Sequence, residues 1–112
     1  MSTKDELVTE NRIQELGLNA PRLTPELIDK VIIGKTFTIL PSGKCMICEL
    51  TLKNGFTVRG ESACVSKANF NQEIGEKISY DNARNKVWEL EGYALQERLY
   101  FEANGFKTDI SE

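Results

Sequence analysis

Histidine is absent from the 112-residue sequence, and this absence excludes several kinds of catalytic site at once. Histidine is the commonest general base near neutral pH, the usual activator of serine and cysteine nucleophiles, and a frequent zinc ligand. Carboxylates remain, but Glu61, Glu89 and Glu91 have no spacing that specifies an acid-base or metal pair. The composition therefore predicts a protein that is not an enzyme and that uses no cofactor or metal.

Long apolar runs are also lacking. No stretch approaches the roughly 18 apolar residues of a membrane helix, and the polar N-terminus has no secretory signal. Lys and Arg number 14 against 17 Asp and Glu, which gives a net charge of -3. We therefore expect a cytoplasmic protein that binds neither membranes nor, over its whole surface, nucleic acid.

Cysteines are few and odd in number. Three cysteines cannot form a complete set of disulfides, and they fit a reducing compartment. Cys45 and Cys48 have the C-x-x-C spacing of a zinc knuckle or a redox pair, but their surroundings predict a strand. Residues three apart in a strand point to opposite faces, so we expect two small strand residues, one of them buried.

The order of patterns predicts a single α+β domain, residues 1–112, with two short N-terminal helices, a three-stranded antiparallel meander and a long C-terminal helix packed on the sheet. Its parts are a helical segment 1–35, a β-meander 36–65, a long helix 66–99 and a tail 100–112. Thr3 with Glu6 forms a capping box for a first helix that ends near Gly17. Thr24-Pro25-Glu26 starts a second helix, which Gly34 ends.

The register of the meander follows from the requirement that apolar side chains share one face. A three-residue loop at 53–55, with Gly55 left-handed, pairs Leu52 with Phe56, whereas a two-residue turn splits the apolar residues between faces. A four-residue loop at 41–44 continues this face into the first strand. The predicted apolar face consists of Phe37, Ile39, Met46, Cys48, Leu50, Leu52, Phe56 and Val58. The opposite face is polar and pairs Glu49 with Arg59.

The last third predicts a helix with more apolar surface than one sheet covers. Asn69 with Gln72 resembles a capping box, and we expect the helix to start near Asn71. At about 100° per residue, two apolar stripes fall on different sides. They consist of Phe70, Ile74, Ile78 and Trp88 on one side, and Tyr80, Ala83, Val87 and Ala94 on the other. Either the helix bends near Gly92 or it buries a second face on another subunit. We favour the second explanation, which predicts a homo-oligomer.

Two groups of residues are candidate ligand contacts. Arg59, Glu61 and Ser62 end a strand that leads to Asn69, and such a strand-to-helix turn can hold a phosphate or a carboxylate. The alternative is structural, with Gly60 easing a bend and Ser62 capping a turn.

The second group is Trp88, Glu91 and Tyr93, which have the parts needed to stack a base and bond its edge. The same residues are typical of a core or a dimer interface. Nearby, Lys77, Arg84 and Lys86 alternate with acidic residues, a pattern that indicates surface ion pairs.

Several segments together resemble a phage family. They are Ala20–Pro25, Thr51–Val58, Gly60–Ala63, Asn69–Phe70, Glu73–Gly75 and Trp88–Leu95. The chain is similar, from about Leu16 to Leu99, to the small tailed-phage and prophage proteins named after gene product forty-nine of phage N-four and gene sixty-six of phage Sf-six. That pattern has proline where Glu89 stands, and glutamate favours an unbroken helix here. The resemblance implies a phage protein in the cytoplasm of the infected bacterial host, and it implies no catalytic residues.

Small phage proteins of this type often interfere with host functions, including antiviral defence. We therefore expect a non-catalytic accessory protein that acts by binding. Sequestration of a nucleotide-type small molecule between subunits is the first hypothesis. An inhibitor that docks on a host enzyme is the second, and an auxiliary or regulatory factor of phage DNA metabolism, with salt-sensitive binding, is the third.

Overall fold

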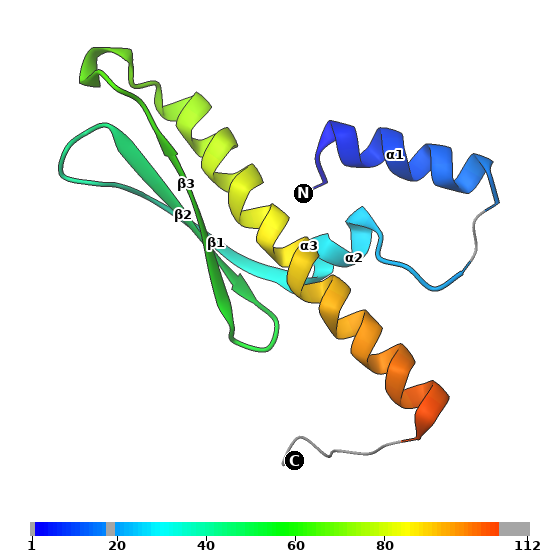
Figure 1. Ribbon diagram of the computed structural model, residues 1–112. Coiled ribbons are helices and arrows are strands. Elements are labelled where there is room, and N and C mark those ends of the chain that lie inside the picture. The colour runs from blue at the N-terminus through cyan, green and yellow to red at the C-terminus, as the bar shows by residue number, and fades with distance from the viewer. Residues whose placement is uncertain (1, 18–19, 106–112) are drawn as a thin grey trace.

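A computed structural model describes residues 2–17 and 20–105, and it has the predicted α+β architecture (Figure 1). The elements are α1 (Lys4–Glu15), α2 (Pro25–Val31), β1 (Ile32–Ile39), β2 (Cys45–Leu52), β3 (Thr57–Ala63), a short 3-10 helix η1 (Lys67–Asn69) and α3 (Gln72–Asn104). The strands form one antiparallel sheet in the order β1-β2-β3. Helix α3 lies across one face of this sheet, and α1 and α2 lie beside α3 on its other side.

Helices α1 and α2 begin as their capping residues predict. The Thr3 side chain accepts from the Glu6 backbone N–H while the Glu6 side chain accepts from the Thr3 backbone N–H. Gly17 follows with a φ of 68°, as expected for a left-handed stop. Helix α2 is capped by Thr24 but ends at Val31, not near Gly34. The prediction was wrong there because Ile32 already has extended backbone, and Gly34 lies within β1.

The predicted register of the sheet is confirmed. Leu50 pairs with Val58 and Cys48 with Gly60, and Gly55 has a φ of 95° in the hairpin loop. The other hairpin pairs Ile39 with Met46 across the loop 41–44. Cys48 is fully buried while Cys45 is half-buried on the opposite face, so the two thiols do not converge. Glu49 and Arg59 pair on the polar face, with 3.6 Å between Oε2 and Nη1.

Small residues carry the contact between α3 and the sheet. Gly75, Ser79 and Ala83, each four residues apart, are buried and lie against β3. A Cβ at Gly60 would overlap the backbone of Ser79 and Ala83, so only glycine permits this approach. The predicted stripe through Ile74 and Ile78 is instead exposed at 57% and 45%. The closest contact with the sheet therefore uses the smallest side chains and not the most apolar ones, and this stripe is left partly uncovered in the single chain.

The core includes only part of the predicted apolar face. Its buried hydrophobic members are Ile28, Met46, Cys48, Leu50, Leu52, Val58, Ala83 and Val87. Ile39 and Phe56 lie in register with this face but are 45% and 57% exposed. Ile39 ends β1 and Phe56 lies in the loop before β3, whereas α3 packs mainly on β3 and β2. Val87, a member of one of the two predicted apolar stripes, packs in the core of its own chain.

Helix α3 is much longer than the sheet that it covers. Its 33 residues span about 50 Å, whereas the seven residues of β3 span about 23 Å. The helix is continuous through Gly92, the position of the bend that was the less favoured of the two explanations. Its cap is Asn71, whose side chain accepts from the Ile74 N–H, and not Asn69, which lies in η1. The C-terminal half of α3 therefore projects beyond the sheet (Figure 1).

Candidate functional site

A buried arginine joins the three helices. Arg84 of α3 is 1% exposed, and its Nε donates to Glu6 Oε1 at 3.0 Å and to Oε2 at 2.8 Å. Its Nη1 donates to the Tyr80 hydroxyl at 2.9 Å and lies 2.9 Å from Asp29 Oδ1. Trp88 Nε1 donates to the same Glu6 Oε2 at 2.8 Å. One carboxylate of α1 is thus held by two side chains of α3.

The electrostatics of this cluster keep its carboxylates ionised. Burial raises the pKa of Glu6, but hydrogen bonds from Arg84, Trp88 and Thr3 outweigh burial and leave the pKa below its ordinary value. Burial and hydrogen bonding act on Asp29 in the same opposed way, and its pKa is also lowered. Burial lowers the pKa of Arg84, whereas its bonds to Glu6 raise it, and the net shift is upward. The cluster is therefore a network of three charged groups, with two carboxylates sharing one guanidinium.

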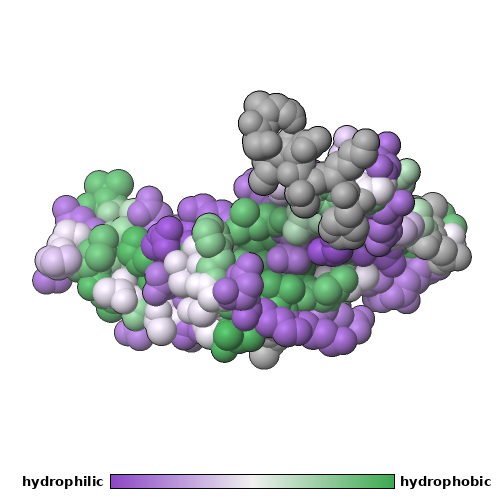
Figure 2. Space-filling model, turned by 90° about the horizontal axis from the view of Figure 1, so that it is seen from below, coloured by the Kyte–Doolittle hydropathy of each residue, from purple (hydrophilic) through white to green (hydrophobic). Residues whose placement is uncertain are grey.

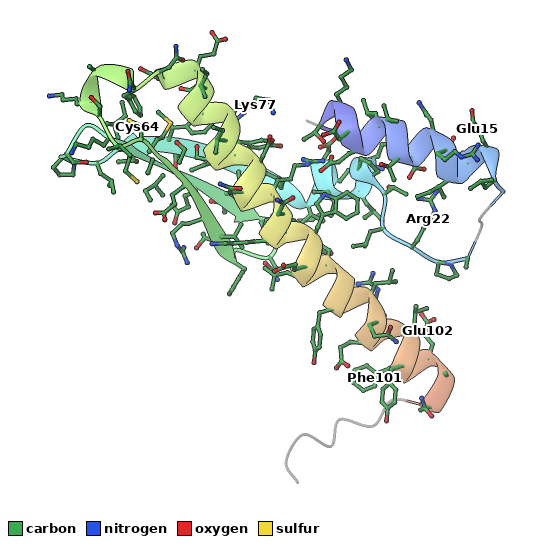
Figure 3. All side chains as sticks on the ribbon, turned by 45° about the horizontal axis from the view of Figure 1, so that its top comes forward. Glu15, Arg22, Cys64, Lys77, Phe101 and Glu102 are labelled. Carbon is green, nitrogen blue, oxygen red and sulfur yellow. The ribbon has the colours of Figure 1, made fainter. Side chains whose placement is uncertain are left out.

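A second tie holds α1 at its far end. Arg22, in the linker before α2, reaches toward α1 and donates from Nη1 to Glu10 Oε1 at 2.6 Å and from Nη2 to Glu10 Oε2 at 2.8 Å (Figure 3). This two-pronged bond, with another from Gln14, lowers the pKa of Glu10 to about 2. Helix α1 is thus attached mainly by two glutamates, while its apolar Leu7 and Val8 are 46% and 62% exposed.

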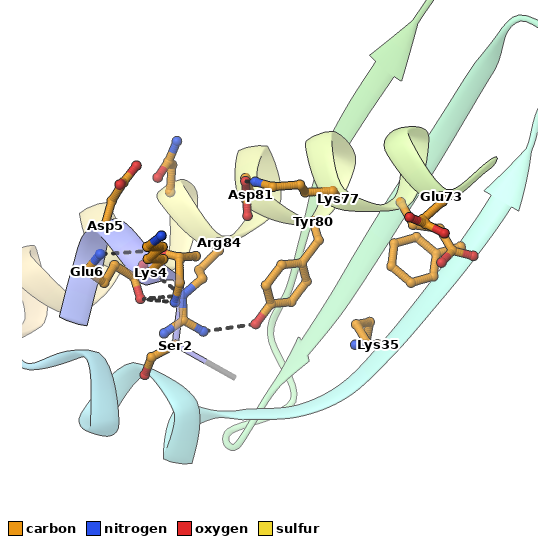
Figure 4. A pocket seen from close by; sticks show the side chains of 14 residues that line it. Ser2, Lys4, Asp5, Glu6, Lys35, Glu73, Lys77, Tyr80, Asp81 and Arg84 are labelled. Atoms are coloured by element: carbon orange, nitrogen blue, oxygen red, sulfur yellow. Dashed lines mark hydrogen bonds and ion pairs between the residues drawn. The ribbon is translucent and has the colours of Figure 1, made fainter. Parts of the chain in front are cut away.

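An open groove of about 840 Å³ lies between the start of α1, β1 and α3 (Figure 4). Lys35 lies at the aromatic part of this groove, with Nζ 5.1 Å from the centroid of the Tyr80 ring and 5.8 Å from that of Phe37. Four basic and five acidic side chains line the groove: Lys4, Lys35, Lys77 and Arg84, with Asp5, Glu6, Glu73, Glu76 and Asp81. The lining as a whole therefore carries one negative charge in excess.

A smaller groove of about 290 Å³ lies on the other side of Glu6. Trp88, Leu23, Pro25 and Ile13 give it an apolar lining, and Asp5 and Glu6 border both grooves. The start of α1 therefore separates an aromatic, charged groove from an apolar one.

The projecting half of α3 carries the most exposed aromatic side chains of the helix. Tyr93 and Tyr100 are 69% and 55% exposed, and Leu90 is 39% exposed. Phe101, near the end of α3, packs edge-on against Tyr100 with 5.7 Å between ring centroids (Figure 3). Hydrophobic side chains are also exposed at the centre of the face shown in Figure 2. The described chain thus presents 13 exposed large hydrophobic residues against eight buried hydrophobic ones.

The structure does not bring together the first group of predicted ligand contacts. Arg59 is exposed and pairs with Glu49, and Glu61 is exposed on the same polar face. Ser62 points the opposite way, is buried, and donates to the Gly75 carbonyl oxygen at 3.2 Å. Asn69 is exposed in η1. Ser62 therefore joins β3 to α3, a structural role that differs from the turn cap given as the alternative for this group.

The second predicted group is also divided. Trp88 is half-buried against the core and lines the smaller groove, whereas Glu91 and Tyr93 line neither groove. Trp88, a member of one of the two predicted apolar stripes, is partly covered by α1 and α2 of the same chain. Within the described residues, α3 exposes apolar side chains before Trp88, at Ile74 and Ile78, and beyond it, at Leu90, Tyr93 and Tyr100.

Arg84 is the main residue that the sequence pattern misplaces. The prediction of surface pairing is confirmed for Lys77 and Asp81, whose Nζ and Oδ2 are 2.8 Å apart, but it was wrong for Arg84. A usable signal was present, because Tyr80, Arg84 and Trp88 are four residues apart and share one side of the helix. Glu6 and Asp29 carried no such signal, because their contacts with Arg84 span 78 and 55 residues of sequence.

Two further searches concern the described residues alone. Within residues 2–17 and 20–105, no helix has the length and apolarity needed to cross a membrane. Across the same described ranges, no three or more Cys, Asp and Glu side chains gather in a way that could hold a metal ion.

Comparison with known proteins gives one match. The model of a family described as "Phage protein (N4 Gp49/phage Sf6 gene 66) family" matches residues 23–99, which include α2, the sheet and most of α3. The searches of curated proteins and of solved structures found no match. Helix α1, with Glu6 and Glu10, precedes the matched segment.

Proposed function

The chain belongs to the N4 Gp49/Sf6 gene 66 family of phage proteins, and from this premise we propose that it is an accessory protein that acts by binding and not by catalysis. The observation that carries the proposal is the uncovered apolar face on the projecting half of α3. Contiguous exposed apolar surface of this kind marks interaction sites in folded proteins. The buried ionic cluster around Arg84 joins helices, and the sequence offers no histidine as a general base.

The partner that we propose for this face is a second copy of the chain. Leu90, Ala94 and Phe101 are separated by four and then by seven residues, so they share one side of α3. The same side of the helix faces the sheet in its N-terminal half. If the partner's α3 ran parallel on this side, its N-terminal half would collide with the sheet of the first copy. In an antiparallel pair, the two sheets lie at opposite ends of the paired helices.

Charge and aromatic spacing fit that antiparallel arrangement. Glu91 and Arg98 are seven residues apart, as are Tyr93 and Tyr100. The charge pair is centred between Ala94 and Leu95, and the tyrosine pair between Gln96 and Glu97. A two-fold axis between Leu95 and Gln96 therefore brings both pairs close, each twice, with an offset of about 3 Å along the helix. A homo-oligomer assembled in this way leaves both grooves of each copy open.

The biological role that we propose is interference with the infected bacterium, including its antiviral defence, in the host cytoplasm. In this role the oligomer sequesters a nucleotide-type small molecule between subunits. Within each subunit, the groove at Lys35, beside the rings of Tyr80 and Phe37, is a second place suited to an aromatic anion, and its carboxylates oppose highly charged ligands. A ligand held in that groove would contact one subunit and would not need the interface.

Sedimentation velocity over a range of protein concentrations tests the assembly. We expect the wild type to associate and the double variant Tyr93→Ser/Tyr100→Ser to remain monomeric. Val8→Ser is the matched control, because Val8 is 62% exposed on a different helix. A wild type that stays monomeric at every concentration rejects the homo-oligomer.

Isothermal titration with cyclic and ADP-ribose-type nucleotides tests the ligand. Binding by the wild type and its loss in the monomeric double variant support a site between subunits. No heat at high ligand concentration removes this ligand class. The second candidate, an inhibitor of a host enzyme, then uses the same face of α3. It predicts a single stoichiometric host partner that the wild type retains and the double variant loses.

A further inference from the structure

Arg84 and Trp88 hold a carboxylate that comes from outside the family-matched segment. Both residues lie within residues 23–99, whereas Glu6 precedes that segment. The two Glu6 oxygens receive three hydrogen bonds from them, two from Arg84 Nε and one from Trp88 Nε1. The donors come from two side chains and converge on both oxygens of one group. This arrangement can recognise a carboxylate or a phosphodiester.

The donors are held in place without the help of Glu6. Arg84 also contacts the Tyr80 hydroxyl, Asp29 Oδ1 and, from Nη2 at 3.3 Å, the Pro25 carbonyl oxygen. All three partners belong to α2 or α3, so the guanidinium keeps its position if α1 moves away. Its Nε then remains directed at the place that the Glu6 carboxylate leaves.

Helix α1 is attached in a way that favours exchange. It contributes no residue to the hydrophobic core, and its described ties are polar ones made by Glu6, Glu10 and the preceding Ser2. Because Asp5 and Glu6 border both grooves, displacement of this segment joins the two grooves over Arg84 and Trp88. Elements with few buried apolar contacts open at the lowest free-energy cost.

We propose that Arg84 and Trp88 form a binding site for an oxyanion with a single negative charge, and that Glu6 is an internal stand-in which the ligand displaces. Asp29 already contributes one negative charge beside Arg84, so a carboxylate or a phosphodiester fits better than a dianion. The rest of such a ligand would lie against the rings of Phe37 and Tyr80 in one groove or against Leu23 in the other. This site does not depend on assembly through α3.

Trp88 provides a specific probe because it is the only tryptophan in the chain. Its indole N–H signal in a ¹H–¹⁵N spectrum reports on the donor that contacts Glu6. The experiment titrates Glu6→Ala and the wild type with sodium acetate and, separately, with dimethyl phosphate, at an ionic strength kept constant with sodium chloride. We expect a saturable shift in Glu6→Ala with an apparent Kd at least about tenfold lower than in the wild type, where the internal carboxylate competes.

The matched control is Glu10→Ala, which removes the same charge from the same helix but releases Arg22 instead of Arg84. It should respond as the wild type does. In the Glu6→Ala background, Arg84→Lys should abolish saturation, because a lysine cannot offer the Nε donor. Glu6→Gln keeps the size of the side chain and loses its charge, and it should bind the probes with intermediate affinity.

Each outcome decides the question. Saturation by acetate alone assigns the site to carboxylates, and saturation by dimethyl phosphate alone assigns it to phosphodiesters. A folded Glu6→Ala protein that does not saturate with either probe overturns the proposal. A Glu10→Ala protein that binds the probes as tightly as Glu6→Ala overturns it as well. If Glu6→Ala does not fold, a Glu6→Gln response identical to that of the wild type overturns it as well.

Discussion

The two halves of α3 differ in what surrounds them, although they form one continuous helix. From Gln72 to Val87 the helix lies on the sheet through glycine, serine and alanine, and its buried arginine binds α1 and α2. From Trp88 to Asn104 it runs beyond the sheet and exposes two tyrosines. The first half has side chains selected for close approach, and the second has side chains suited to contact with another molecule. Helix continuity thus does not imply a single role.

Removal of the Arg84 charge is the change that should damage the first half most. Arg84→Met leaves Glu6 and Asp29 as carboxylates without their common cation, and we expect a loss of about 3–5 kcal/mol in the free energy of unfolding. Urea unfolding measures it. Lys77→Met removes an ion pair whose lysine side chain is 76% exposed, and its loss should stay below about 1 kcal/mol. Equal losses in the two variants would contradict a structural role for Arg84.

Glycine-to-alanine changes should have opposite signs in the strand under the first half of α3 and within its second half. Gly60→Ala forces the Cβ into the backbone of α3 at Ser79 and Ala83, and we expect a loss of about 1–3 kcal/mol in unfolding free energy. Gly92→Ala meets only Leu23 at 3.9 Å and should gain about 0.5–1 kcal/mol from helix propensity. The same urea experiment compares them. A neutral Gly60→Ala would show that the helix does not approach β3 so closely.

Acid should loosen the ties of α1. The pKa values of Glu6, Asp29 and Glu10 are lowered in the folded chain, that of Glu10 to about 2. Their contribution to stability is therefore complete above the unfolded pKa of about 4.3 and is lost as the pH falls through the folded values. We expect the free energy of unfolding to decrease from about pH 5 toward pH 2, and less steeply in Glu6→Gln. Equal slopes for the two proteins would mean that Glu6 is not held as described.

The smallest effect on the fold is expected from the projecting half. Tyr93→Ser and Tyr100→Ser remove exposed side chains, and each should change the unfolding free energy of the monomer by no more than about 0.5 kcal/mol. Urea unfolding at low protein concentration measures this change without a contribution from assembly. A loss of several kcal/mol at that concentration would show that the tyrosines belong to the core.

The sheet could be predicted because its constraint is local. Leu52, Phe56 and Gly55 allow only one register that keeps apolar side chains together, and the structure has that register. The seam of α3 could be predicted only in part from hydrophobicity, because Ala83 and Val87 belong to one predicted stripe whereas Gly75 and Ser79 carry almost no hydrophobicity. Small residues are needed at these positions because the helix lies close to the sheet, and the pattern of apolar residues in the sequence does not reveal that distance.

The candidate site was less accessible to prediction than the fold. The two parts of the Glu6–Arg84 bond are 78 residues apart, and a single glutamate in a helix cap gives no sign of a distant partner. Trp88 was identified as a candidate contact, but its location beside Glu6 depends on how α1 folds back. Arg59 and Ser62 were grouped because they are near each other in sequence, although alternate strand residues separate them onto different faces.

Hydrogen exchange along α3 at two widely separated protein concentrations tests the contrast between its halves most directly. Amides of residues 72–87 should be protected equally at both concentrations, because their protection comes from the sheet of the same chain. Amides of residues 88–104 should gain protection only at the higher concentration, where copies associate. Protection of the second half that is unchanged by concentration would contradict the account.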